Sequence, residues 1–368
     1  MIRLEPRLTR PKWLAFAVPI GSIIAAMILG ALLIMVSGND ALATYGRIGE
    51  RAFGDVVAWT DTIIAATPLL LTGLAAAAAF RMGLFNIGGE GQFVMGAVAA
   101  AWTGLALGPL GGWVAIPVMV LSGIAAGSIW AAIPGFFKTK FGTNEVITTL
   151  MFNYIAASFA SFLIFGSESF VRELEGSGKV FPQGKVISDD VIWPAFGGGG
   201  FSVPLGFILG CIAAMALWLL YRQTRFGFEI GVVSDSPEAA RYAGINVPRT
   251  GLAVMTISGG LAGLGGASNI GDIRHMLDPK GLNQSGYGYT GIVVAALARW
   301  NPIAVIPVSI LLGGLANAGR SLQGEDFPAG LVGTLQGLLL FCAVSGEFLT
   351  RYRVRVAARR AKVEVKAA

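Results

Sequence analysis

The 368-residue sequence predicts an all-α integral membrane protein with about ten transmembrane helices. Composition is the first reason: 54% of the residues are hydrophobic and 13% are charged, whereas soluble domains carry about 25% charged residues. The second reason is a series of apolar runs, most of them close to the 20 or so residues that a helix needs to cross a bilayer. The third is that Lys and Arg gather in alternate connecting segments, as they do in multi-pass membrane proteins.

Ten apolar runs are expected to cross the membrane, several of them interrupted by Gly or Pro. The first run is longer than the apolar part of a signal peptide, which has about 7–15 residues, so we expect it to remain as a span. The eighth run is short. The runs are residues 14–36, 62–80, 92–107, 113–136, 146–166, 202–221, 250–270, 287–299, 302–318 and 328–346.

The basic residues predict that both termini are cytoplasmic. With ten crossings in that orientation, most of the 27 Lys and Arg residues fall in inner segments and most of the 21 Asp and Glu residues in outer ones. The chain is then one transmembrane domain without a soluble domain large enough for chemistry. Its parts outside the membrane are a cytoplasmic N-terminus at 1–13, an extracytoplasmic loop at 167–201, a cytoplasmic loop at 222–249 and a basic cytoplasmic tail at 347–368.

Charge and cysteine content argue against two other classes of protein. The net charge of +6 does not gather on a groove-binding face, so we expect no nucleic-acid partner. Cys211 and Cys342 both lie inside apolar runs, which favours packing over a disulfide or a metal site. His275 is the only histidine, so no metal site is predicted.

Two segments resemble each other and predict an internal repeat. Residues 83–102 read GLFNIGGEGQFVMGAVAAAW and residues 281–300 read GLNQSGYGYTGIVVAALARW, and the spans that follow share Ile-Pro-Val. The copies are five spans apart, so they would cross the membrane in opposite directions. Inverted repeats with broken helices at corresponding positions are common in transporters, where they mark the substrate pathway.

The first copy places Asn86, Glu90 and Gln92 among glycines. The following run, 92–107, is about 24 Å long as a helix, which is shorter than the hydrocarbon layer of about 30 Å. We therefore expect the Gly-rich piece to dip into the membrane, where irregular backbone must be buried in protein or line a wet cavity. The three side chains would face a pathway or brace the turn. A capped helix start, with Glu90 near the N-terminal dipole, is the other interpretation.

Further polar residues are candidates for the same pathway. Asn153 is predicted to lie near mid-membrane, where an amide is costly unless it is paired or faces a cavity, so it either contacts substrate or joins two helices. In the second copy the corresponding candidates, with the same alternatives, are Asn283, Gln284, Tyr287 and Tyr289.

The cytoplasmic loop contains a short predicted helix over 238–242. Ser236 can cap it, Pro237 suits its first turn and Gly244 can end it. A short helix between two inner span ends is suited to docking a soluble partner, with an ordinary interfacial helix as the alternative. The next span carries a row of glycines at 259–266, which predicts close helix packing.

Three motifs in order give the chain a family resemblance. FNIGGEGQ, then NEVITTLMFNYIA at 144–156, then SPEAARYAGIN before a Gly-rich span, resemble permease subunits of bacterial ABC importers, the binding-protein-dependent transport systems. Within that family the chain resembles the branch of ribose, simple-sugar and nucleoside importers. The pieces FPQGKV and DDVIWP of the outer loop resemble the longer of two paired nucleoside permeases. The resemblance covers most of residues 60–346.

The resemblance implies a transport subunit without its own ATPase site, placed as a multi-pass protein in the bacterial cytoplasmic membrane. It would import nucleosides, purine nucleosides above all, by alternating access; a ribose-type sugar is the alternative substrate. It would bind no cofactor, because a partner ATPase, with two nucleotide-binding domains in one chain, uses the ATP and Mg. The other implied partners are a second, paralogous permease and an extracytoplasmic binding protein or lipoprotein. Coupling to the ATPase would fall to Glu238, Ala239, Ala240, Arg241, Gly244, Ile245 and Asn246.

Two other classes of function remain as alternatives. An ion-coupled secondary transporter usually needs a carboxylate well inside a span, and Glu90 is the serious candidate for one, since Asp61 and Glu145 fall at span ends. A membrane enzyme has less support, because no span contains paired carboxylates, a Cys–His pair or a set of metal ligands.

Overall fold

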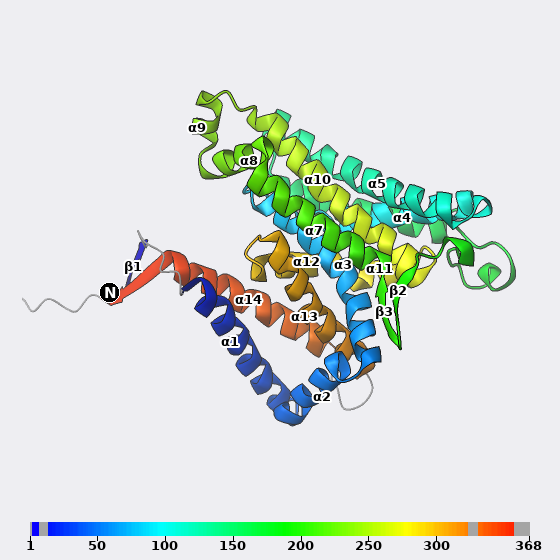
Figure 1. Cartoon of the computed structure of the whole chain (residues 1–368), viewed down its shortest axis with the longest axis horizontal. Coiled ribbons are helices and arrows are strands. Elements are labelled where there is room, and N and C mark those ends of the chain that lie inside the picture. The colour runs from blue at the N-terminus through cyan, green and yellow to red at the C-terminus, as the bar shows by residue number, and fades with distance from the viewer. Residues whose placement is uncertain (1, 7–13, 323–329, 357–368) are drawn as a thin grey trace, which may run out of the picture. The chain divides into compact units, whose positions relative to one another are not determined.

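The computed structural model describes residues 2–6, 14–322 and 330–356. These residues are helical over most of their length (Figure 1). The chain divides into two compact units, Met1–Ala41 with Gly333–Ala368, and Leu42–Val332. Each unit is described by itself.

The first unit combines the two ends of the described chain. Its helices are α1 (Leu14–Val36) and nearly all of α14 (Leu331–Arg351). The strands β1 (Ile2–Pro6) and β4 (Tyr352–Val356) pair antiparallel, with Ile2 opposite Val356. The sequence analysis did not predict these strands. Their pairing puts residues 2–6 and 352–356 on one side of a membrane, which agrees with an even number of crossings. Residues 7–13 and 357–368 of the predicted cytoplasmic ends lie outside the described residues.

The second unit contains the other long helices. After α2 (Ala41–Phe53) come α3 (Val56–Phe80), α4 (Gly89–Leu107), α5 (Gly112–Phe141), α6 (Glu145–Ser161), α7 (Leu205–Gln223), α8 (Arg225–Asp235), α9 (Pro237–Tyr242), α10 (Val247–Ser268), α11 (Pro279–Ser285), α12 (Tyr287–Leu297) and α13 (Pro302–Ser321). A hairpin of β2 (Ala195–Gly198) and β3 (Phe201–Pro204) precedes α7. In Figure 1 this hairpin and the α8–α9 segment lie at opposite ends of the unit.

Seven helices of the described chain are long and apolar enough to cross a membrane, which confirms the all-α membrane class. They are α3, α4, α5, α6, α7, α10 and α13, and an eighth span results if Ile20–Val36 and Ala41–Phe53 form one together. A helix occupies each of the ten predicted runs, but α12 has 11 residues, about 16 Å, and is too short to cross alone. Ten crossings therefore remain a prediction.

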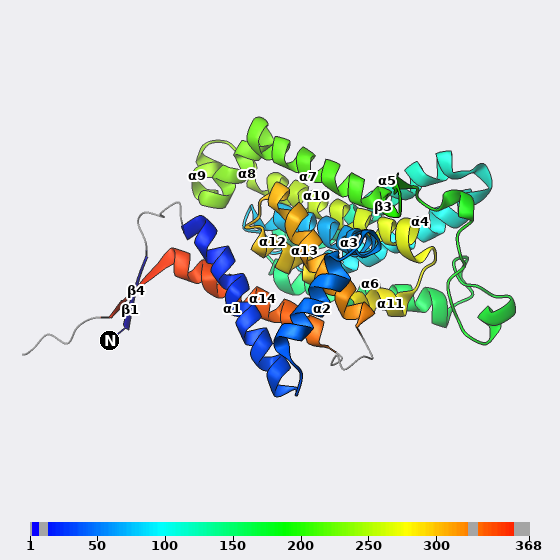
Figure 2. The same cartoon turned by 60° about the horizontal axis from the view of Figure 1, so that its bottom comes forward.

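Close packing of glycines organises the core around α10. A Cβ atom on Gly263 would collide with the backbone carbonyl of Gly123 on α5, and one on Gly259 with that of Gly127. Gly96 of α4 is packed equally closely against Gly263. These contacts place the helix backbones side by side, as small residues allow in membrane proteins. The predicted packing role of the α10 glycines is confirmed. On another side of the core, α12 and α13 pack against α3 (Figure 2).

The segment between α6 and α7 is docked on the π-helical turn Asn269–Arg274, which continues α10. The backbone N–H of Trp193 donates to the carbonyl of Gly271 at 3.0 Å, and the N–H of Ile187 donates to that of His275 at 2.8 Å. The Trp193 ring covers Gly271, where a side chain would have no room. The predicted loop at 167–201 is therefore held by backbone bonds over its second half.

Candidate functional site

Asn86 and Gln92 form a buried reciprocal amide pair at the start of α4. The Asn86 Nδ2 donates to Gln92 Oε1 and the Gln92 Nε2 donates to Asn86 Oδ1, both at 2.9 Å. The two residues are 3% and 1% exposed. Asn86 Nδ2 also donates to Ser258 Oγ of α10 at 2.9 Å, and Ser258 donates to the carbonyl of Ala75 in α3 at 2.7 Å. The pair therefore ties the 81–88 segment to three helices.

A side chain from α6 caps the first turn of α4. Asn153 Oδ1 accepts the N–H of Gly91 at 2.8 Å, while its Nδ2 donates to the carbonyl of Ile87 at 2.9 Å. The same Nδ2 lies 3.2 Å from the hydroxyl oxygen of Tyr289 and donates to it. An amide inside a span is tolerated when it is paired. Asn153 is thus a brace between α6 and α4 that also reaches the second repeat.

Glu90 caps a neighbouring helix and not its own. Its Oε2 accepts the N–H of Gly288, in the first turn of α12, at 2.6 Å. Gly288 packs against the backbone of Gly89 and Glu90 with no room for a Cβ atom. The N-termini of α4 and α12 therefore meet, and their partial positive charges stabilise a carboxylate between them. The Oε1 of Glu90 is buried and has no hydrogen-bond partner in the described part of the chain.

The meeting point lies well inside the helical bundle. Thr72 of α3 donates to the carbonyl of Tyr287 at 2.9 Å, and Thr72 is about 12 Å along α3 from its Phe80 end. Asn153 is likewise about 12 Å from the Glu145 end of α6. The Gly-rich segment thus reaches this depth before α4 begins. The helix length from which this dip into the membrane was predicted needs correction, however. The helix α4 starts at Gly89 and has 19 residues, so it is longer than the predicted run 92–107.

The predicted pathway residues divide into two groups. Asn86, Glu90, Gln92, Asn153 and Tyr289 lie together around the two helix N-termini. Asn283 and Gln284 lie on α11, apart from this network, whereas Tyr287 directly precedes Gly288 at its border and accepts from Thr72 through its carbonyl. Asn283 and Gln284 are exposed on α11, and the Tyr287 ring packs against Phe93 at an interplanar angle of 52°, with centroids 5.4 Å apart.

Two members of the network were missed from the sequence. Ser258 joins the amide pair, and Thr149 Oγ1 accepts the N–H of Ile87 at 3.3 Å. Thr149 lies one helical turn before Asn153, so its spacing was a usable signal. Ser258 is a polar residue in a run of glycines and apolar residues, and this exception to the pattern was the signal in the sequence for a buried hydrogen bond.

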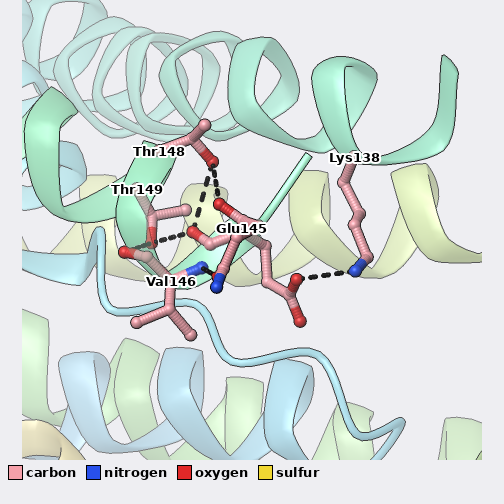
Figure 3. A network of polar contacts seen from close by, with 6 residues as sticks. Lys138, Glu145, Val146, Thr148 and Thr149 are labelled. Atoms are coloured by element: carbon pink, nitrogen blue, oxygen red, sulfur yellow. Dashed lines mark hydrogen bonds and ion pairs between the residues drawn. The ribbon is translucent and has the colours of Figure 1, made fainter. Parts of the chain in front are cut away.

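The Glu145 end of α6 is fixed by an ion pair and a capped helix start (Figure 3). Lys138 Nζ of α5 lies 2.8 Å from Glu145 Oε2, with side chains 37% and 11% exposed. Asn144 Oδ1 accepts the N–H of Val146 at 2.9 Å, and Thr149 donates to the carbonyl of Glu145 at 2.6 Å. Glu145 is thus a helix-end residue, as predicted, and its carboxylate joins α5 to α6.

The loop at 222–249, which the sequence predicts to be cytoplasmic, contains the predicted short helix, α9, after an 11-residue helix, α8, that was not predicted. Ser236 Oγ accepts the N–H of Ala239 at 3.2 Å, so the expected cap is present. Gly244 follows with φ of +77°. Of the residues assigned to coupling, Ala240 is buried and Ile245 is half-buried. The exposed ones are Glu238, Ala239, Arg241, Gly244 and Asn246.

Apolar contacts connect this loop to the 81–88 segment. Ala240 is buried in one cluster with Ile230 of α8, Val254 of α10 and Met82. Ile245 and Leu84 pack against the same cluster. Met82 and Leu84 come directly before Asn86, so the face of α9 that is turned inward and the amide pair are joined by a few residues of chain. The outward face of α9 ends in Tyr242, which is 94% exposed.

Comparisons with known proteins identify the family. Residues 58–344 match the model for the branched-chain amino acid transport system / permease component. The glucose ABC transporter permease protein TsgB13 of Haloferax volcanii is 32% identical over 97% of this chain and 94% of its own. The guanosine ABC transporter permease protein NupP of Bacillus subtilis is 36% identical over 81% and 84%, and the nucleoside ABC transporter permease protein NupB of Lactococcus lactis 29% over 88% and 89%. No solved structure matches.

The family and the helical architecture agree. The match extends from the second residue past the start of α3 to the last part of α14, and so contains the paired N-termini, the α8–α9 segment and the seven candidate spans. The chain therefore belongs to the permease components of the branched-chain amino acid transport system family, and it is a multi-pass membrane subunit of an ABC importer.

Proposed function

We propose that the chain imports nucleosides, with purine nucleosides favoured, across the cytoplasmic membrane by alternating access. The observation that carries this proposal is the similarity, over more than four-fifths of the chain, to permeases named for guanosine and for nucleosides. A simple sugar is the second candidate substrate, because the relative named for glucose is 32% identical over 97% of the chain. The two classes share a neutral, hydroxylated ring.

In this proposal a partner ATPase supplies the energy and this chain binds no nucleotide. The sequence contains no G-x-x-x-x-G-K-[ST] motif of the kind that cradles phosphates. The partner, with two nucleotide-binding domains in one chain, uses ATP and Mg and docks on the exposed face of α9. The burial of Ala240 supports this, since a helix fixed on one side to its own protein can transmit force applied to the other.

The contacts of α9 suggest how movement reaches the middle of the bundle. Displacing α9 shifts the apolar cluster that includes Met82 and Leu84, and with it the 81–88 segment. That segment ends at the Asn86–Gln92 pair and the joined N-termini of α4 and α12. ATP binding to the partner would then favour one arrangement of these helices over the other, which is what alternating access requires.

The proposal also includes two further partners. A second, paralogous permease completes the membrane part, and an extracytoplasmic binding protein or lipoprotein delivers substrate to the side of the β2–β3 hairpin. That hairpin and α9 lie at opposite ends of the second unit (Figure 1), which fits delivery at one end and energy input at the other.

Uptake in cells tests the proposed substrate. A strain lacking this chain should lose uptake of labelled guanosine and adenosine at low concentration, and a plasmid copy should restore it. Uptake of glucose and ribose should stay unchanged. Loss of sugar uptake alone would replace the nucleoside proposal with the sugar one. In parallel, the cognate binding protein should bind guanosine or adenosine and not ribose.

A further inference from the structure

One face of α6 is exposed along its whole length and changes character half-way. In its first half the exposed side chains are apolar, with Ile147 58% and Met151 48% exposed. From Tyr154, which is 63% exposed, polar groups join the apolar ones: Ser158 is exposed and Ser161 half-buried, beside the exposed Ile155 and Phe162. Tyr154, Ser158 and Ser161 are spaced i, i+4 and i+7, so they share this face.

A shallow groove continues this face toward the second repeat. Ser158, Ser161 and Phe162 line it together with Asn283 of α11. The hydroxyls of the two serines and the amide of Asn283 have no hydrogen-bond partner within the described residues. Ser158 lies about 20 Å along α6 from Glu145, at a depth where lipid cannot satisfy such groups. This face is therefore turned toward something other than lipid chains.

Two tyrosines lie at the end of the polar half that is nearer to Glu145. Tyr289 of α12 is 42% exposed, and its hydroxyl oxygen accepts from Asn153, so its O–H remains free to donate. Tyr154 directly follows Asn153 on α6. Both tyrosines thus lie at the level where α4 and α12 meet. Below them, toward Glu145, the exposed residues of α6 are Ile147 and Met151.

The polar half of the face carries no charge between Tyr154 and Ser161. The nearest carboxylate belongs to Glu90, which is 6% exposed and lies beside Tyr289 on the N–H of Gly288. At the far end of the face, Lys280 lies 5.3 Å over the ring of Phe165. A surface of hydroxyls, an amide and aromatic rings without a charge is suited to a neutral ligand that offers hydroxyls and a ring.

We propose that Tyr154, Ser158, Ser161, Asn283 and Tyr289 form the substrate-contacting face of this subunit, and that Met151 and Ile147 close the path below it. The ligand class is a neutral hydroxylated ring compound, a nucleoside or a sugar. The proposal rests on the proposed function and adds the residues that contact the ligand. It also adds Tyr154, Ser158 and Ser161 to the residues selected from the sequence.

Cysteine accessibility tests the proposal in membranes that contain the assembled importer. Cys211 and Cys342 are first replaced by alanine. Ser158→Cys is then compared with Ile129→Cys on α5, whose native side chain is 64% exposed. A small charged thiol reagent should modify the cysteine of Ser158→Cys at least about tenfold faster than that of Ile129→Cys. The Ile129 position faces lipid in this account, and a cysteine in apolar surroundings forms less thiolate. Guanosine with its binding protein should slow that reaction.

Two results would overturn the proposal. Equal, slow modification of both cysteines would place this face against lipid. If the cysteine of Ser158→Cys resists the reagent but cross-links to the second permease, this face of α6 lies inside a permanent interface between the two permeases. A reaction that guanosine does not slow, while glucose or ribose does, would support the face and identify the sugar class.

Transport kinetics separate this inference from the proposed function. Tyr154→Ala should raise the KM for guanosine uptake by about tenfold, the loss expected for one ring or hydroxyl contact. Phe159→Ala, on the same helix and 41% exposed, is the matched control and should change KM little. If the wild-type importer takes up guanosine and the two variants behave alike, this inference fails while the proposed function stands. If the wild-type importer takes up none, the proposed function fails first.

Discussion

The reciprocal amide pair at the start of α4 yields the most quantitative prediction. Asn86→Ala removes the bonds to Gln92, Ser258 and the N–H of Gly88, and leaves the Gln92 amide buried without a partner. Side-chain hydrogen bonds within membrane proteins contribute about 0.6 kcal/mol on average and up to about 1.7. Four such bonds give an expected loss of about 2–4 kcal/mol in the free energy of unfolding.

The double mutant decides whether the two amides act as a unit. Gln92→Ala alone should cost about 1–3 kcal/mol, through the same two reciprocal bonds. Once one amide is gone, removing the other relieves a buried unsatisfied group, so the double mutant should lose less than the sum of the single losses. The coupling energy should be about 1–3 kcal/mol, the value of two bonds.

Reversible unfolding in mixed detergent micelles, followed by tryptophan fluorescence, gives the four free energies of this cycle. A matched cycle at Thr103→Val and Ser122→Ala serves as the control, since one partly buried bond of 3.1 Å joins those hydroxyls. Its coupling should stay below about 1 kcal/mol. Strict additivity at Asn86 and Gln92, within about 0.5 kcal/mol, would refute the account of the pair as a structural brace.

Three further changes have expected outcomes. Gly263→Ala pushes a methyl group into the α5 backbone and should lower the free energy of unfolding by about 1–3 kcal/mol; an unchanged value would contradict the packing of α10. Gly288→Ala separates the N-termini of α4 and α12 and should reduce guanosine uptake more than it reduces the midpoint of unfolding, with a normal uptake rate as the contrary result. Lys138→Ala removes the partly exposed ion pair with Glu145 and should lower the free energy of unfolding by about 1 kcal/mol or less; a much larger loss of stability in a thermal-shift assay would mean that the pair is buried in the assembled importer.

Sequence reasoning succeeded where local chemistry determines structure. Apolar length alone located a helix in each of the ten runs, and the Ser236-Pro237 pair correctly marked the start of α9. The role of the α10 glycines also followed from composition, since few other uses exist for a row of small residues inside a span. Each of these features depends on residues close together in the chain.

Features that depend on distant partners were harder to predict. The sequence left open whether Glu90 faces a pathway, braces the turn or lies near the dipole of its own helix; its carboxylate accepts the N–H of Gly288, which is 198 positions away in the chain. The α8 helix fell within the predicted loop at 222–249, because its apolar stretch is too short to cross a membrane. Its buried residue Ile230 packs in one cluster with Met82 and Ala240, which are distant in the chain. The sequence also did not reveal which side chains of α6 are exposed, so Tyr154 was not among the pathway candidates selected from it.

The most direct test of the account is guanosine uptake into proteoliposomes that contain this chain, the second permease, the ATPase and the binding protein. We predict uptake that requires ATP on the α9 side, persists when ion gradients are collapsed and disappears with Ala240→Glu, which breaks the contact of α9 with Met82 and Leu84. Uptake that this chain performs without the ATPase, driven by a proton or sodium gradient, would contradict it.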